Sequence, residues 1–502
     1  MPDTSRSQVR VGLILPPAGA VRGAMRGAVG LAHWVVAHPQ LQLVGLEETP
    51  VARANALADR LVRLEARLRP GPPPGDLPAT EDTGAPDVVV DLSDGTPNKG
   101  EVPPLGVWHL TASQADAAIR PLATGAAATE VTLLCTRADA TTCLARARYS
   151  PKPTAGLNAS FIAEKAVLLV MRALAEVALT GALPSAQNAG GAPPAAPSLL
   201  RYVIGLGPTL FRRASTRVAQ TVGWQPGVFA MRLCPGGPFD FDPKVGTTLV
   251  PPQGRFWADP FLVSRAGEEY LFYEEFHEAT QRGVLKVARL RGDRMEELGE
   301  TVTRPHHLSF PFVFDAQGAH WMLPETSRGG RVEVWRAVDF PLRWELAATA
   351  MDGRAPADAV LAEVEGAWWL FAHFAQDATR DYCSELHVFR VDGPLLRRIE
   401  PHPLNPVVID SRTARAGGRV WSEGGRLFRA SQDNAHGVYG WGLNIMEITR
   451  LDLRGYAERP VRHIGPGFLP GVMGCHHMDF VAGRVVIDMR YLSARAARHS
   501  ER

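Results

Sequence analysis

The sequence predicts a two-domain protein in which an α/β domain precedes an all-β domain built as a five-bladed propeller. Three observations lead to this fold class. The chain of 502 residues is longer than a single core usually supports. Residues 9–182 alternate strand-like and helix-like segments. After about residue 225 the helical spacing is lost, and pairs of aromatic-rich strands recur.

The composition is that of a folded protein with sizeable cores. Hydrophobic residues make up 45% of the chain and charged residues 21%, and the mean hydropathy is −0.08. The formal net charge of +2 comes with no run of basic residues, so a nucleic-acid partner is not expected. Arginine far exceeds lysine, and Ala, Gly and Pro are abundant, which indicates a GC-rich bacterial source.

Cysteine usage and the N-terminus favour a cytoplasmic protein. The five cysteines are an odd number without a CxxC pair, which argues against a disulfide framework and against a zinc site. The apolar run at residues 9–15 is shorter than the core of a signal peptide. Residues 163–183 carry several charges, so no transmembrane segment is expected.

The first domain is expected to span residues 1–182. Its strand-like runs lie at 9–15, 41–46, 87–92, 106–110 and 131–135, and its helical stretches lie at 20–37, 51–69 and 158–182. This alternation predicts a mostly parallel sheet with helices on both faces. No Gly-x-Gly-x-x-Gly motif follows the first run, so no nucleotide cofactor is expected.

A linker with a short helix is expected at residues 183–224, because Pro, Ala and Gly dominate residues 183–198. The propeller is expected at 225–495, where a strand, a Gly-containing turn and a second aromatic-rich strand recur five times. Aligned positions 259, 311, 358, 415 and 477 are separated by 52, 47, 57 and 62 residues, which is typical of propeller blades. Residues 226–235 could supply an outer strand that closes the ring. A β-sandwich is the competing interpretation.

In a propeller the first strands of the blades line the central channel, so side chains at equivalent positions converge. Here those positions hold Asp259, Pro311, Asp358, Arg415 and His477. The ends of the second strands add Glu274, Glu275, Glu325, Gln432 and Asp433. Carboxyl groups held close together push each other's pKa apart, as acid and base do in glycoside chemistry. Glu274 and Glu275 are adjacent in a strand, so at most one points inward.

Each candidate also has a structural interpretation. An Asp before Pro, as in Asp259-Pro260, is often a turn residue. Trp257 could stack on a sugar ring, although aromatic residues at such positions more often fill the space between blades. The adjacent histidine pairs lack chelating spacing, so no metal site is predicted. Arg412 and Arg415 make an acidic or phosphorylated sugar plausible.

The runs FWADPFLV, YLFYEEF, SFPFVFDAQGAHWMLPETS and DAVLAEVEGAWWLFA carry a resemblance. They resemble the propeller domain found at the N-terminus of plant glucosamine inositolphosphorylceramide transferases and in many bacterial proteins. That domain is similar to the five-bladed propellers of glycoside hydrolase families 43 and 32. The resemblance implies that Asp259 is the general base and that His477 lies near the channel centre. It leaves Asp358 and Glu325 as acid candidates, because Pro311-Phe312 stands where the hydrolases have an aspartate.

The first domain resembles a degenerate formyltransferase-type Rossmann domain. The run GVWHLTAS lies where that family has its Asn-x-His motif, and NASFIAEKAVLLVMRAL resembles its closing helix. His109 matches the motif, whereas Val107 replaces the asparagine.

Three functional hypotheses follow. The first is an enzyme that cleaves or transfers a glycosyl unit at the propeller mouth, with Asp259, Glu325 and Asp358 as catalytic carboxyl groups. The groups that would hold the carbohydrate or glycoconjugate are Trp257, Glu274, Arg412, Arg415, Gln432, Asp433 and His477. The second hypothesis is a non-catalytic glycan-binding propeller joined to an inactive Rossmann domain. The third is sugar formyl or acyl transfer by the first domain.

Overall fold

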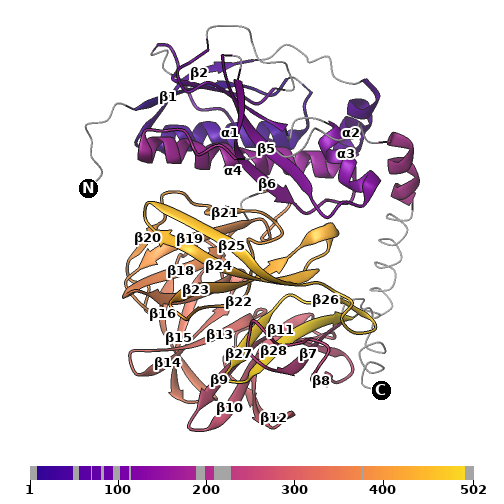
Figure 1. The fold of residues 1–502 in the computed structure, drawn as a ribbon, viewed down its shortest axis with the longest axis vertical. Helices are drawn as coiled ribbons and strands as arrows, with labels where there is room; N and C mark the ends of the chain where they lie inside the picture. The colour runs from indigo at the N-terminus through magenta and orange to yellow at the C-terminus, as the bar shows by residue number, and fades with distance from the viewer. Residues whose placement is uncertain are drawn as a thin grey trace. The chain divides into compact units, whose positions relative to one another are not determined.

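The computed structural model describes residues 8–17, 19–48, 56–68, 71–80, 84–93, 102–111, 115–138, 140–187, 198–207, 228–375 and 377–491. The chain forms two compact units (Figure 1). The first contains residues 1–211 together with 376–381, and the second contains 212–375 together with 382–502. Among the described residues, no helix is long and apolar enough to cross a membrane.

The first unit contains a mixed six-stranded sheet in the order β2-β1-β3-β4-β5-β6. Its strands are β1 (Val9–Ile14), β2 (Leu41–Glu47), β3 (Val88–Asp91), β4 (Val107–Leu110), β5 (Thr129–Arg137) and β6 (Ala140–Tyr149). Strands β1 to β4 pair in parallel, whereas β5 runs antiparallel to both β4 and β6.

The α/β Rossmann-like domain predicted for residues 1–182 is therefore wrong. Only the short connection 138–139 separates β5 from β6, and a connection of this length permits antiparallel pairing alone. The sequence interpretation overlooked β6, although its segment ATTCLARARY alternates polar and apolar residues near its end. The chain as a whole is mostly β.

The helices of the first unit are α1 (Arg22–Ala37), α2 (Ala56–Leu68), α3 (Ala115–Thr124) and α4 (Ala155–Thr180). The first three all pack against α4, which is the longest. The Thr154 side chain caps the start of α4 by accepting a hydrogen bond from the backbone N–H of Leu157. Gly181, in the left-handed conformation, ends it. A further helix covers residues 199–207.

The second unit is a propeller of five sheets, as the repeat predicts (Figure 1). Blade one contains β9 (Arg255–Arg265), β10 (Glu268–His277), β11 (Arg282–Arg291) and β12 (Arg294–Glu300). Blade two contains β13 (Ser309–Ala316), β14 (Ala319–Glu325), β15 (Val332–Asp339) and β16 (Arg343–Ala350). Blade three contains β17 (Ala357–Val364), β18 (Ala367–His373), β19 (Glu385–Val391), β20 (Ile399–Pro401) and β21 (Val408–Ile409).

Blade four contains β22 (Ala416–Glu423), β23 (Arg426–Asp433), β24 (Gly442–Asp452) and β25 (Gly455–Ile464). Blade five combines both ends of the unit, with β26 (Val472–Gly474), β27 (Met478–Val481), β28 (Arg484–Tyr491), β7 (Val228–Pro235) and β8 (Thr247–Leu249). Strand β7 pairs with β28 along its whole length. The expectation that residues 226–235 close the ring is confirmed for the described part, β7.

The inner strands form a closed ring, because β9 contacts β13, β13 contacts β17, β17 contacts β22, β22 contacts β27, and β27 contacts β9. Each of the first four inner strands has a break in register at a corresponding point. In the first three blades a non-glycine residue with positive φ lies there: Asp259 (51°), Phe310 (48°) and Asp358 (46°). The repeat alignment is therefore shifted by one residue in blade two, where Phe310 rather than Pro311 corresponds to Asp259.

Candidate functional site

Asp259 is held at the bulge of β9 by neighbouring blades. Its Oδ2 accepts a hydrogen bond from the backbone N–H of Phe310 at 3.2 Å. Its own backbone N–H donates to Oδ2 of Asp488, on β28, at 3.3 Å. A positive φ in a residue other than glycine is costly and persists only where the surroundings enforce it, which is common at functional sites. The carboxyl group is therefore fixed in position from both sides.

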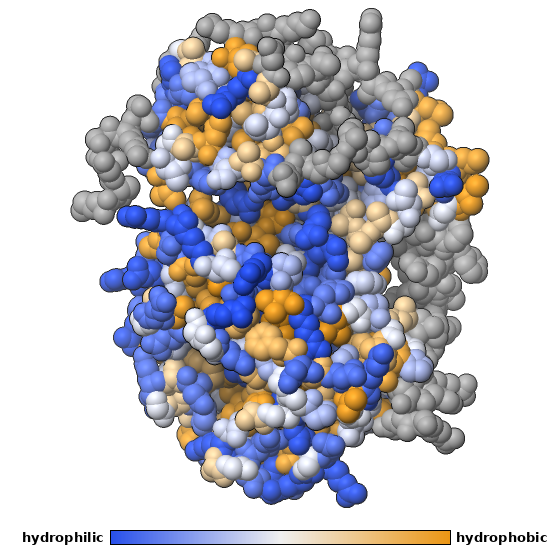
Figure 2. Space-filling view, viewed as in Figure 1, coloured by the Kyte–Doolittle hydropathy of each residue, from blue (hydrophilic) through white to orange (hydrophobic). Residues whose placement is uncertain are grey.

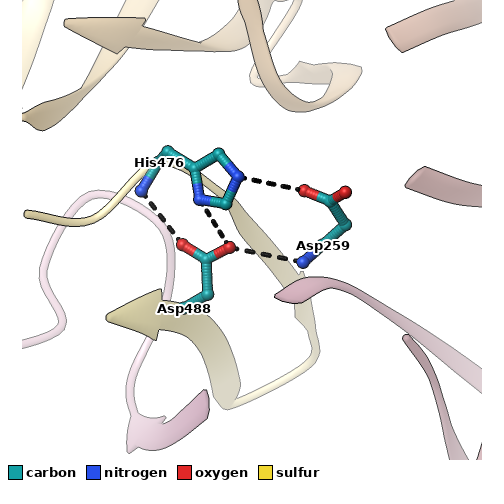
Figure 3. A group of neighbouring side chains, drawn as sticks. All are labelled: Asp259, His476 and Asp488. Atoms are coloured by element: carbon teal, nitrogen blue, oxygen red, sulfur yellow. Dashed lines mark hydrogen bonds and ion pairs between the residues drawn. The ribbon is translucent and has the colours of Figure 1, made fainter. Parts of the chain in front are cut away.

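His476 links Asp259 to Asp488 (Figure 3). Its Nδ1 lies 2.7 Å from Oδ2 of Asp488, and its Nε2 lies 3.3 Å from Oδ1 of Asp259. Asp488 in turn accepts the backbone N–H groups of His476 and His477, both at 3.0 Å. The three side chains are all buried. The result is a carboxylate–imidazole–carboxylate chain whose far end, Asp488, is anchored to the backbone.

The electrostatics of this chain differ from one end to the other. Burial lowers the pKa of His476, but the two flanking aspartates outweigh it, so that the pKa is raised. Burial opposes ionisation of Asp488, yet its bonds to His476 bring the pKa below 3.8. For Asp259, burial dominates and raises the pKa to about 7, although His476 opposes the shift. Asp488 therefore carries the fixed negative charge, and Asp259 is the group poised to exchange a proton near neutrality.

A second carboxyl pair lies in the same electrostatic cluster. Nε of Arg415 lies 2.7 Å from Oδ2 of Asp358, and its Nη2 lies 3.7 Å from Oε2 of Glu325. Burial raises the pKa of Asp358 to about 6, against the attraction of Arg415. Both Asp358 and Arg415 act electrostatically on Asp259, so blades one, two, three and four contribute to one site.

Glu274 completes the cluster from β10. It is 5% exposed, and among the described residues its Oε1 has no hydrogen-bond partner. Nε2 of His307 lies 3.6 Å from this oxygen. Burial, followed by repulsion from Asp259 and Glu325, raises the pKa of Glu274 well above 4.5. A neutral carboxyl group of this kind can donate a proton.

Tyr439 and Gln432 lie beside the charged groups. The Arg415 guanidinium lies 5.1 Å from the centre of the Tyr439 ring, which also meets the His476 ring edge-on at 5.2 Å. Tyr439 remains 39% exposed, so its ring offers an apolar surface next to the carboxyl groups. Gln432 donates to the backbone oxygen of Ala416, and its buried Oε1 has no partner within the described part of the chain.

The donor set of Asp259, His476 and Asp488 also resembles a cation site, because one ligand atom from each lies within 4.8 Å of the others. However, both oxygens of Asp488 already accept backbone N–H groups, and one of them also pairs with the imidazole. We therefore interpret the two aspartates as groups that orient the His476 imidazole and favour its protonated form.

The structure brings Asp259, Glu274, Glu325, Asp358 and Arg415 together, as the repeat predicts. Other candidates lie elsewhere. Trp257 is 7% exposed, and its indole N–H donates to Glu275, which faces away from the cluster and pairs with Arg255, His277 and Lys286. Arg412 and Asp433 pair with each other, and Asp433 also contacts His463. Both candidate arginines therefore already have carboxylate partners.

His477 is fully buried between Phe261 and Phe310, whose rings it meets edge-on at 4.6 and 5.2 Å. Within the described structure neither of its ring nitrogens has a hydrogen-bond partner, and burial lowers its pKa to about 3. Its neighbour His476 reaches the site instead. His476 and His477 lie between β26 and β27, where the repeat alignment does not determine which of the two side chains faces the site. The sequence interpretation also missed Asp488 and Tyr439.

Residues 247–464 match the family model described as glucosamine inositolphosphorylceramide transferase 1, N-terminal. Curated proteins named glucosamine inositolphosphorylceramide transferase 1 are similar. The protein from Oryza sativa subsp. japonica is 34% identical over 226 residues, and the one from Arabidopsis thaliana is 33% identical over 209. These matches cover 43% and 40% of this chain, but only 30% and 27% of the relatives.

The family match lies wholly within the propeller and gives no support to the formyltransferase-like interpretation of the first 182 residues. The plant source of these relatives counts against the bacterial source that the composition indicated. Solved structures that are similar include Zg3597, a family 117 glycoside hydrolase from Zobellia galactanivorans, with 14% identity, a TM-score of 0.35 and coverage of 53% of this chain and 91% of that one. The RS223 β-xylosidase has 11% identity, a TM-score of 0.36 and coverage of 47% and 92%.

The raised pKa of Asp259 predicts a pH-dependent effect of the Asp259→Asn substitution on stability. A carboxyl group whose folded pKa is about 7 and whose usual value is 3.8 stabilises the fold below about pH 4 and loses this contribution as the pH rises through 7. Asparagine does not ionise, so the stability of the variant does not fall with the ionisation of this side chain. We therefore expect the melting temperature of the variant minus that of the wild type to be larger at pH 8 than at pH 5. A difference between the two proteins that does not change with pH would contradict the assignment.

Proposed function

We propose that the cluster at the inner ends of the blades is the active site of an enzyme that cleaves or transfers a glycosyl unit. One observation carries this proposal. Asp259 and Glu274 are both buried on paired strands; the raised pKa of Glu274 keeps it protonated as an acid, and the pKa of Asp259, about 7, lets it take up a proton near neutral pH. The family match over residues 247–464 and the plant relatives support a carbohydrate-active protein.

In the proposed reaction the glycosidic C–O bond breaks as Glu274 gives its proton to the leaving oxygen. Asp259 accepts a proton from water or from an acceptor hydroxyl, whose oxygen forms the new bond to the anomeric carbon. His476, held by Asp488, is a positioning residue that fixes the orientation of the Asp259 carboxyl group. Arg415 keeps Asp358 charged, and Glu325 and Asp358 offer acceptors for sugar hydroxyl groups.

The proposed substrate is a carbohydrate or a glycolipid. The name of the plant relatives refers to glucosamine and to inositolphosphorylceramide. An amino sugar would suit the cluster, because its carboxyl groups outnumber its basic groups and Arg415 is already paired with Asp358. Tyr439 offers a face for the ring of the sugar.

The Glu274→Gln variant tests the proton donor. The wild type and the variant would be screened against aryl glucosides, glucosaminides and furanosides whose leaving groups differ in acidity. A missing acid is expected to cost about 10²–10⁴-fold in kcat for poor leaving groups and far less for good ones. Glu269→Gln on the same strand is the matched control, since Glu269 pairs with Arg484 and is not among the charges that act on Asp259 or Glu274.

If the Glu274→Gln substitution lowered kcat by the same factor for all leaving groups, this result would contradict the role of Glu274 as the acid. Stabilisation of the wild type by a sugar without turnover of any substrate would favour the alternative, a glycan-binding propeller.

A further inference from the structure

We propose that the solvent-facing sides of α2 and of helix 199–207 form a docking surface for an anionic lipid bilayer. The surface, here called the Leu/Arg face, belongs to the first unit and does not depend on the activity proposed for the propeller. It comprises Leu57, Arg60, Leu64, Arg67 and Leu68 of α2, with Leu200, Arg201, Val203 and Ile204 of helix 199–207.

Helix α2 presents large apolar side chains where a surface helix normally presents polar ones. Leu57, Leu64 and Leu68 are 67%, 59% and 77% exposed. With Arg60 and Arg67 they occupy helical positions three, four or seven residues apart, which lie on one side of the helix. Ala58 and Val62 on the other side are buried, so α2 already uses a separate apolar side for packing. The outward leucines are not needed for the core.

Helix 199–207 repeats this arrangement next to α2. Leu200, Val203 and Ile204 are 69%, 55% and 64% exposed. Tyr202 points the other way, is buried, and donates from its hydroxyl to Oε1 of Glu65 on α2 at 2.6 Å. The two helices are therefore tied together. Figure 2 shows orange and blue atoms side by side at the upper right of the view, where Figure 1 places α2 and helix 199–207.

The charge of the Leu/Arg face selects the partner. Arg60, Arg67 and Arg201 are exposed among the apolar side chains, whereas Glu65 is bound to Tyr202. Leucines that enter the boundary between headgroups and acyl chains, flanked by guanidinium groups that reach lipid phosphates, are typical of helices lying on a membrane surface. An anionic bilayer satisfies both features together.

The experiment is co-sedimentation of the full chain with vesicles of phosphatidylcholine alone or with about one third phosphatidylglycerol. We expect binding to the mixed vesicles and weak binding to the neutral ones. The double variant Leu64→Glu with Val203→Glu is expected to lower the partition coefficient at least tenfold, because each substitution replaces a membrane-inserting side chain by an anion. Arg60→Gln with Arg67→Gln is expected to weaken binding to the mixed vesicles only.

The matched control is Val338→Glu with Val461→Glu on the propeller surface, where the two valines are 57% and 43% exposed. This control should bind the mixed vesicles as the wild type does. Thermal melting of each variant would show that it is folded, since all six substituted positions are exposed. The proposal is overturned if the wild type binds neither vesicle, or if the control loses binding as strongly as Leu64→Glu with Val203→Glu. Light scattering would also detect a dimer. If the wild type is a dimer and only Leu64→Glu with Val203→Glu is a monomer, the face binds a second copy of the chain instead of a bilayer.

Discussion

Substitution of Asp259 by asparagine is expected to lower kcat by at least about a thousandfold while the protein stays folded. Asparagine keeps an oxygen that can accept the backbone N–H of Phe310, and it tolerates the positive φ of this position better than most residues do. What it loses is the capacity to accept a proton. The variant should therefore stay folded, and above about pH 7 it should be more stable than the wild type, while turnover is largely lost.

The pH profile supplies a second readout for the same residue. If Asp259 is the base, kcat/KM of the wild type should rise with pH up to about 7, as the carboxyl group loses its proton. The Asp259→Asn variant should lose this rise. Asp315→Asn is the control, because Asp315 lies on the neighbouring inner strand β13 but is largely exposed. Wild-type turnover in Asp259→Asn, with its pH dependence intact, would remove Asp259 from the reaction.

The Asp479→Ala substitution is expected to lower the free energy of unfolding of the propeller by about 3–5 kcal/mol. Asp479 on β27 is fully buried, and it binds the Arg419 guanidinium of β22 and the backbone N–H of Leu262 on β9. Arg419 also donates to the backbone oxygen of Leu262. The carboxylate thus joins blades four, five and one. Its removal leaves a largely buried guanidinium and a backbone donor without this partner.

Urea unfolding followed by tryptophan fluorescence would measure this effect, because eight of the eleven tryptophans lie within residues 228–491. Asp479→Asn should be milder, since an amide oxygen still accepts the N–H of Leu262. Glu268→Ala, which breaks a half-exposed pair with Arg291, should cost no more than about 1 kcal/mol. An equal, small effect of Asp479→Ala and Glu268→Ala would show that the link between the blades does not stabilise the ring.

The propeller and half of its site follow from the sequence because the repeat is local. The two inner strands of each blade and the turn between them form one continuous segment, so Asp259, Asp358 and Arg415 could be assigned to the channel-lining ends of their blades without a structure. The residues that these side chains bind could not be predicted from the sequence. Arg415 binds Asp358 of the preceding blade, and Asp488 reaches Asp259 across the ring closure, and neither pairing leaves a signal in local spacing.

Two errors have a simple physical origin. His476 and His477 lie in the segment between β26 and β27, outside any strand, so strand alternation could not decide which of them faces the site. In the first unit, the alternation of strands and helices suggested parallel pairing throughout. Strand β5 instead runs antiparallel to β4, and the turn after it is too short for a crossover, so β6 is antiparallel to β5.

The pairing of β7 with β28 affects how the propeller can come apart. Because the first and last strands of the ring lie in one sheet, neither end can fray without breaking the ladder that joins it to the other. Unfolding must then begin with the loss of a whole blade contact, which raises the kinetic barrier more than the equilibrium stability.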